Sequence, residues 1–119
     1  MVADSGHSVL IVEDETLLAL MLEDLLSDIG HHVMHADSLP DALALVECEH
    51  FDAAILDIDI RGKDVFPVAA RLRELHTPFV FVSARHADRL SPEFSQEQLL
   101  AKPYTIAQVQ QSLDRMLAD

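Results

Sequence analysis

The sequence lacks several features that would point to other classes of protein. Cys48 is its one cysteine, so an internal disulfide is excluded and no cysteine pair is available to bind a metal. No apolar run approaches the roughly 20 residues that a membrane-spanning helix needs. The N-terminus also lacks the basic and apolar segments of a signal peptide. These absences favour a cytoplasmic protein with no membrane association.

Positive charge is also scarce. The chain has 8 basic and 21 acidic residues, which gives a formal net charge of −13. This excess repels phosphate backbones, so we do not expect direct binding of nucleic acid. It suits a partner with a basic surface, or a bound cation. The length of 119 residues, half of them hydrophobic, predicts one domain with an ordinary core over residues 1–119.

Short apolar runs alternate with segments of helical periodicity along the chain. The runs are apolar throughout, which is typical of parallel strands covered on both faces. We therefore predict a single doubly wound α/β domain. The expected strands are Ser8–Val12, His32–Ala36, Phe51–Asp57, Pro78–Ser83 and Leu99–Ala101. Helices are expected over 16–30, after the N-cap Ser38, over Val65–Leu75 and after Thr105, whereas Pro92 interrupts any helix in the irregular segment 84–98.

Polar residues follow four of the expected strands. In an open parallel sheet, ligands bind at the carboxyl ends of the strands. Taken singly, each residue has a simpler explanation, as a helix N-terminal acid, a turn serine or a surface lysine. Their joint placement at one edge of the sheet instead indicates a site. The residues are Glu13 and Asp14, Asp57, Ser83 and Lys102.

The chemistry of this set favours phosphoryl transfer. Clustered carboxylates repel one another and favour a divalent cation, and oxygen ligands of this kind select Mg²⁺. The lysine and the serine hydroxyl would contact further phosphoryl oxygens. A carboxylate in this setting can act as the nucleophile and become an aspartyl phosphate.

Four motifs, in this order and spacing, resemble those of a known family. They are "VLIVEDE", "AAILDID", "FVFVSA" and "LLAKPY", and the resemblance extends over about Val9 to Leu117. The chain resembles the receiver domain of bacterial two-component response regulators, which has a flavodoxin-like, CheY-like fold. The resemblance implies a five-stranded parallel sheet of order 2-1-3-4-5 with five helices.

The resemblance also implies a role for each acid. Asp57 matches the phosphoacceptor, which also ligates the metal. Asp14 matches the direct Mg²⁺ ligand, and Glu13 matches the acid that binds the metal largely through water. Asp59 stands at the position whose backbone carbonyl, rather than its carboxylate, ligates Mg²⁺.

The remaining matched residues are Ser83 and Lys102. Ser83 resembles the hydroxyl that follows the phosphoryl group, and Lys102 resembles the family's lysine. The Lys102–Pro103 bond is expected to be cis, as in the family. Tyr104, after this pair, is expected to pack in the protein.

The chain departs from the family at three positions. Arg61 and Val65 replace a common proline and glycine, and Leu99 replaces the switch aromatic. A leucine cannot swing a polar ring between buried and exposed states, so the usual coupling of the hydroxyl to that ring is not expected. "PFVFVSA" partly matches a stand-alone branch with a "PFxFATGY"-like strand, whose partners are histidine kinases of the HWE type.

The function implied is phosphoryl acceptance in two-component signalling. The donor would be a sensor histidine kinase or a histidine phosphotransfer protein. An unknown downstream protein would read a changed surface around the irregular segment, the fifth strand and the last helix. No output segment follows Asp119 in the sequence, so the domain is expected to signal alone unless it is a fragment. It would not be an enzyme in the ordinary sense.

Two other interpretations stay open. One is a pseudo-receiver that binds a partner without being phosphorylated. The other is a Mg²⁺-dependent phosphohydrolase of the haloacid-dehalogenase type, in which Asp57 and Asp59 form an Asp-x-Asp motif and Asp59 is the acid–base group. Three histidines, His31, His32 and His35, are expected at the opposite end of the sheet with structural roles.

Overall fold

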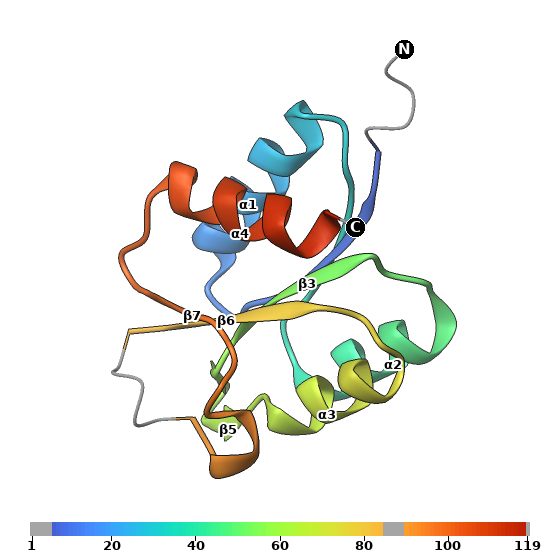
Figure 1. The fold of residues 1–119 in the computed structure, drawn as a ribbon, viewed down its shortest axis with the longest axis vertical. Helices are drawn as coiled ribbons and strands as arrows, with labels where there is room; N and C mark the ends of the chain where they lie inside the picture. The colour runs from blue at the N-terminus through green and yellow to red at the C-terminus, as the bar shows by residue number, and fades with distance from the viewer. Residues whose placement is uncertain (1–5, 85–89, 119) are drawn as a thin grey trace.

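The computed structural model describes residues 6–84 and 90–118, and its centre is a five-stranded parallel sheet (Figure 1). The strand order is β2-β1-β3-β6-β7, which is the predicted 2-1-3-4-5 order when the two short strands β4 and β5 are set aside. The apolar runs form the strands because both faces of the sheet are covered. The strands are β1 Ser8–Val12, β2 His32–Ala36, β3 Ala53–Asp57, β6 Phe79–Ser83 and β7 Leu99–Ala101.

Helices cover the sheet on both faces. In Figure 1, α1 (Thr16–Asp28) and α4 (Ile106–Leu117) lie on one face, whereas α2 (Leu39–Cys48) and α3 (Phe66–Glu74) lie on the other. Each face has its own apolar cluster against the sheet. The predicted caps are present: the Ser38 hydroxyl accepts the N–H of Asp41 at the start of α2, and Thr105 begins α4 with a capping box. The doubly wound α/β prediction is confirmed.

The helix count differs from the five that we expected. The described residues form four α-helices and one 3₁₀ helix, Pro92–Phe94, in the segment where the sequence shows no regular pattern. Residues 85–89 of that segment lie outside the described residues. The 3₁₀ helix is held by Phe94, which is 1% exposed and stacks on Phe66 at a ring-centroid distance of 5.4 Å. Its ring also meets Phe79 and Phe81 edge-on.

A small antiparallel hairpin follows β3 in the segment that the sequence analysis assigned to no strand or helix. Its strands are β4 (Asp59–Ile60) and β5 (Lys63–Asp64). The two turn residues both have positive φ, 52° at Arg61 and 81° at Gly62, as a type I′ turn requires. The hairpin therefore begins two residues after Asp57, at the carboxyl edge of the sheet.

The parallel registers bring the strand ends level. Val12 pairs with both Ala36 and Leu56, and Ser83 pairs with Ala101, so the residues that follow these strands meet at one edge. No helix in the described ranges has the length and apolar character needed to cross a membrane.

Candidate functional site

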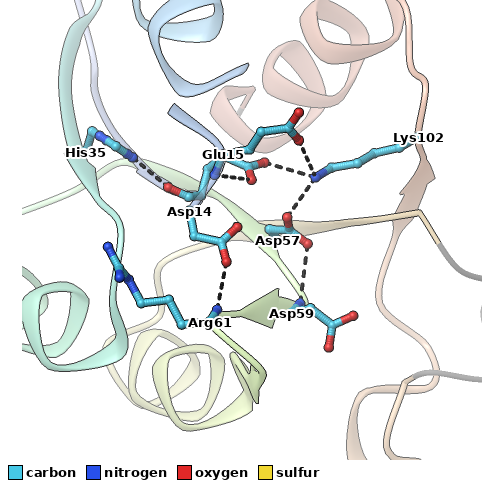
Figure 2. Close-up of polar contacts among 8 residues, drawn as sticks. Asp14, Glu15, His35, Asp57, Asp59, Arg61 and Lys102 are labelled. Atoms are coloured by element: carbon cyan, nitrogen blue, oxygen red, sulfur yellow. Dashed lines mark hydrogen bonds and ion pairs between the residues drawn. The ribbon is translucent and has the colours of Figure 1, made fainter. Parts of the chain in front are cut away.

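The Lys102 side chain reaches the end of β3 and contacts two buried carboxylates (Figure 2). Its Nζ lies 2.7 Å from Asp57 Oδ2 and 3.2 Å from Glu13 Oε1, with Glu15 Oε1 at 3.9 Å. The position of Lys102 is set by β7, because its N–H donates to the Ser83 carbonyl at 2.8 Å and so continues the pairing with β6. The bond from Lys102 to Pro103 is cis, as expected.

Three carboxylates converge at this edge. Glu13, Asp14 and Asp57 each offer an oxygen, and the three oxygens lie within 4.8 Å of one another. Glu13 and Asp57 are buried, at 1% and 6% exposure. The cluster has more negative charge than the single ammonium of Lys102 neutralises. It therefore has the composition of a cation site.

Burial and repulsion strongly affect Glu13. Burial, and then the charge of Asp57, raise the pKa of the Glu13 carboxyl to about 7. The N–H of Glu15 donates to Glu13 Oε2 at 3.1 Å and opposes this rise. Burial disfavours the charged form of Lys102, but Asp57 and Glu13 outweigh burial and raise the pKa of Lys102.

The donor atoms fit a hard divalent cation such as Mg²⁺. The three side chains offer only oxygen, which magnesium prefers. Among the described residues, Glu13 Oε1 is buried without a hydrogen-bond partner, although the Lys102 ammonium lies near it. A buried carboxylate oxygen of this kind costs free energy unless a cation or a donor meets it.

Asp59 contributes its main chain to this edge. Its N–H donates to Asp57 Oδ1 at 3.3 Å. In Figure 2 the Asp59 side chain is directed away from the Asp57 carboxylate. An acid–base group acting on a phosphoryl group at Asp57 would have to face it. The arrangement therefore fits a main-chain role for Asp59 better than the Asp-x-Asp phosphohydrolase role.

The structure thus brings the predicted site residues to one edge. Glu13, Asp14, Asp57 and Lys102 lie together, and Asp59 is adjacent through its N–H. Ser83 ends β6, is 1% exposed, and meets this edge through its carbonyl contact with Lys102. Their chemical roles stay predictions.

The sequence interpretation was wrong about His35. We expected it at the opposite end of the sheet, but its Nε2 lies 2.7 Å from the Glu13 carbonyl oxygen and forms a hydrogen bond with it (Figure 2). His35 pairs with Ile11 in the parallel register, which places it one residue before the carboxyl end of β2. For His31 and His32 the expected position was correct, because both bond to the backbone of His7, before the start of β1.

Arg61 is a second residue that the sequence interpretation did not place in the site. Its backbone N–H donates to Asp14 Oδ2 at 2.7 Å, and its side chain donates to Asp37 (Figure 2 shows the first contact). The sequence signal was the arginine at a position where the family commonly has proline.

Tyr104 packs against the apolar cluster that contains Leu22 and Leu26 of α1. Burial, and then the charge of Glu13, raise the pKa of its phenol to about 12. In the described part of the chain its hydroxyl is buried and makes no hydrogen bond. The ring borders two hollows against α1, one containing Lys102 and the other formed by apolar side chains. This agrees with the expected packing role.

The chain is similar to known receiver domains in sequence and structure. The family model for the response regulator receiver domain matches residues 9–114. The transcriptional regulatory protein TcrA of Mycobacterium tuberculosis is 35% identical over 107 residues, which cover 86% of this chain and 42% of that protein. The chain therefore spans less than half of that relative's length. It belongs to the response regulator receiver domain family.

Solved structures show the same architecture. The solution structure of SdrG from Sphingomonas melonis Fr1 has a TM-score of 0.82 and 38% identity, and the match covers 97% of this chain and 99% of SdrG. The receiver domain of sensor histidine kinase PA1611 from Pseudomonas aeruginosa PAO1 has a TM-score of 0.82 at 23% identity, covering 96% and 99%. That domain is described with a magnesium ion in its active site cleft.

Proposed function

We propose that residues 1–119 act as one receiver domain that accepts a phosphoryl group on Asp57 and signals to another protein. The observation that carries this proposal is the contact between Asp57 Oδ2 and Lys102 Nζ at 2.7 Å, within a cluster of three carboxylates. A nucleophilic carboxylate beside a fixed cation is what transfer of a phosphoryl group to aspartate requires.

The proposed reaction moves the phosphoryl group from a phosphohistidine to Asp57. A carboxylate oxygen of Asp57 attacks phosphorus and forms a new P–O bond. The P–N bond breaks, and its electron pair stays on the imidazole nitrogen of the donor. The other ring nitrogen of the phosphohistidine carries a proton when the bond breaks, so the imidazole leaves in its neutral form. The products are a neutral histidine and an acyl phosphate on Asp57. The donor is a histidine kinase, of the HWE type by the partial branch resemblance, or a histidine phosphotransfer protein.

The surrounding residues stabilise charge on the transferring group. Lys102, already in contact with Asp57, neutralises one phosphoryl oxygen, and the Ser83 hydroxyl donates a hydrogen bond to another. Mg²⁺ would be held by Asp14, Asp57 and the Asp59 carbonyl, with Glu13 through water. When bound, it supplies further neutralisation of the phosphoryl oxygens. The magnesium described in the similar fold of the PA1611 receiver supports this assignment.

The signal would leave through the surface next to Lys102. β7 carries Leu99, which is partly buried against the apolar cluster on the α2–α3 face of the sheet, at the position where the family commonly has an aromatic. The surface formed by the 3₁₀ helix, β7 and α4 would therefore change by movement of the backbone and not by rotation of a ring. A downstream protein would read that change. In this proposal the domain is a signalling module, with no enzymatic turnover on other molecules.

The test is phosphorylation with a small acyl phosphate and Mg²⁺, followed by intact mass. We expect one added phosphoryl group on the wild-type chain and on Asp59→Ala, and none on Asp57→Ala. If neither the acyl phosphate nor a phosphorylated histidine kinase modifies the wild type, the chain is a pseudo-receiver. If the donor is hydrolysed steadily and this hydrolysis is lost in Asp59→Ala, the chain is a phosphohydrolase.

A further inference from the structure

The turn of the β4–β5 hairpin has an unusual residue at its first position. Type I′ turns favour Asn, Asp or Gly there, because both central residues have positive φ. This turn instead has Arg61 at φ 52°, followed by Gly62. A left-handed conformation at a residue with a long side chain costs on the order of 1–3 kcal/mol, so other contacts must compensate for it.

The Arg61 side chain supplies those contacts. Its Nε donates to the Asp37 carbonyl oxygen at 2.8 Å, and its Nη2 donates to Asp37 Oδ2 at 3.0 Å. Asp37 directly follows β2, whereas Arg61 lies in the hairpin after β3. Because β1 lies between β2 and β3 in the sheet, this Arg61–Asp37 bridge spans the carboxyl end of β1.

Asp14 lies at that end of β1, and the backbone of the same turn contacts it. The Arg61 N–H donates to Asp14 Oδ2 at 2.7 Å (Figure 2). This hydrogen bond holds the Asp14 carboxylate, which also offers an oxygen to the cluster formed with Glu13 and Asp57. The distance is short for an N–H···O bond and fits a charge-assisted contact.

We propose that Arg61 is a positioning residue for the cation site, and this inference rests on the Mg²⁺-dependent function proposed above. The Arg61–Asp37 bridge holds the turn in its left-handed conformation. The turn then presents the Arg61 N–H to Asp14, which keeps one carboxylate oxygen aimed at the cation. Neighbouring groups that orient metal ligands commonly contribute roughly 10- to 100-fold to metal affinity.

The charge of Arg61 acts in the opposite direction, and this makes the inference testable. If the guanidinium influenced the site only through its positive charge, removing it would strengthen Mg²⁺ binding, because like charges repel. If Arg61 positions Asp14, removing the bridge weakens Mg²⁺ binding although a positive charge has been lost. The two explanations therefore predict opposite signs.

The decisive variant is Arg61→Asn. Asparagine suits the first position of a type I′ turn, so the hairpin is kept while the side-chain bridge is lost. We expect Mg²⁺ affinity to fall roughly three- to tenfold, as a weaker case of the orienting effect above. We expect the same fall in Arg61→Lys, which keeps the charge but cannot form the two-pronged contact.

Two further variants control for indirect effects. Arg71→Lys disrupts a similar arginine–carboxylate contact, in which Nε and Nη2 of Arg71 donate to Glu47 between α3 and α2. It should leave Mg²⁺ affinity unchanged. Asp37→Ala should weaken Mg²⁺ binding. Adding Arg61→Asn to this variant should cause little further loss of Mg²⁺ affinity, because both substitutions remove the same Arg61–Asp37 bridge.

The measurements are calorimetric Mg²⁺ titration, thermal unfolding without Mg²⁺, and the rate of phosphorylation by an acyl phosphate as Mg²⁺ is varied. In Arg61→Asn the Mg²⁺ concentration that gives half the maximal rate should rise in step with the dissociation constant for Mg²⁺. The rate at saturating Mg²⁺ should stay within about twofold of wild type, because excess metal overcomes a loss of affinity. Unchanged or tighter Mg²⁺ binding in Arg61→Asn, with normal binding by wild type, overturns the inference alone. Absence of Mg²⁺ binding by wild type overturns the proposed Mg²⁺ site and the inference together.

Discussion

The raised pKa of Glu13 predicts that Mg²⁺ binding releases a proton near neutral pH. The cation requires an ionised carboxylate, but with a pKa of about 7 half of the Glu13 side chains are protonated at pH 7. The ionised fraction is about 0.9 at pH 8 and about 0.1 at pH 6 by this equilibrium. Apparent Mg²⁺ affinity should therefore be about tenfold weaker at pH 6 than at pH 8.

The assay is calorimetric titration with Mg²⁺ in two buffers of different ionisation enthalpy. The number of protons released per ion should be about 0.9 at pH 6 and about 0.1 at pH 8, because only the protonated fraction of Glu13 has a proton to lose. Glu13→Gln should bind Mg²⁺ more weakly and lose this pH dependence. Equal affinity at both pH values with no proton release would refute the reasoning, as would an unchanged pH dependence in Glu13→Gln.

The same shift has a consequence for stability without Mg²⁺. Because folding raises the pKa of Glu13 from 4.5 to about 7, the folded state favours its neutral form, and stability falls as pH rises through this window. The loss is at most about 3 kcal/mol at 1.36 kcal/mol per pKa unit. At pH 8 without Mg²⁺, Glu13→Gln should therefore unfold at a higher temperature than wild type, because it removes a buried charge that repels Asp57.

Three other predictions concern single side chains. Lys102→Met removes the ammonium beside Asp57, so Mg²⁺ affinity should rise on the order of tenfold, and a fall in affinity would contradict this reasoning. In the same variant, phosphorylation by an acyl phosphate should slow severalfold, which intact mass measured against time would show. Phe94→Ala should lower the free energy of unfolding, measured by urea denaturation, by about 3–5 kcal/mol, because the Phe94 ring packs against three other phenylalanines. A loss below about 1 kcal/mol would contradict that packing. Thr105→Ala removes the side-chain cap of α4 and should cost about 1 kcal/mol in thermal unfolding, with the exposed Ser95→Ala as a neutral control.

Much of the fold and of the candidate site could be predicted from the sequence, because both depend on where the strands end. A continuous apolar run such as Ala53–Leu56 predicts a buried parallel strand, and the acid that ends it must then lie at the carboxyl edge. The same reasoning correctly placed Glu13 after β1 and Lys102 after β7. The same reasoning could have placed His35 near the site, because β2 runs toward the carboxyl edge of the sheet and ends one residue after His35.

Other features could not be predicted in this way. Each strand of the β4–β5 hairpin has two residues, which is too short for an alternating pattern, and the Arg61–Gly62 turn is not a favoured type I′ pair. The contact between Arg61 and Asp37 depends on the reach of a long side chain across the end of a third strand. Sequence spacing alone does not encode that reach.

The position of Tyr104 gives the protein a built-in optical probe. The chain has one tyrosine and no tryptophan, so light absorbed beyond the phenylalanine range excites a single ring. That ring borders the same hollow as Lys102, and its hydroxyl is screened from water. A change in intrinsic fluorescence on adding Mg²⁺ or a phosphoryl donor would therefore report on the surroundings of Lys102 without any label.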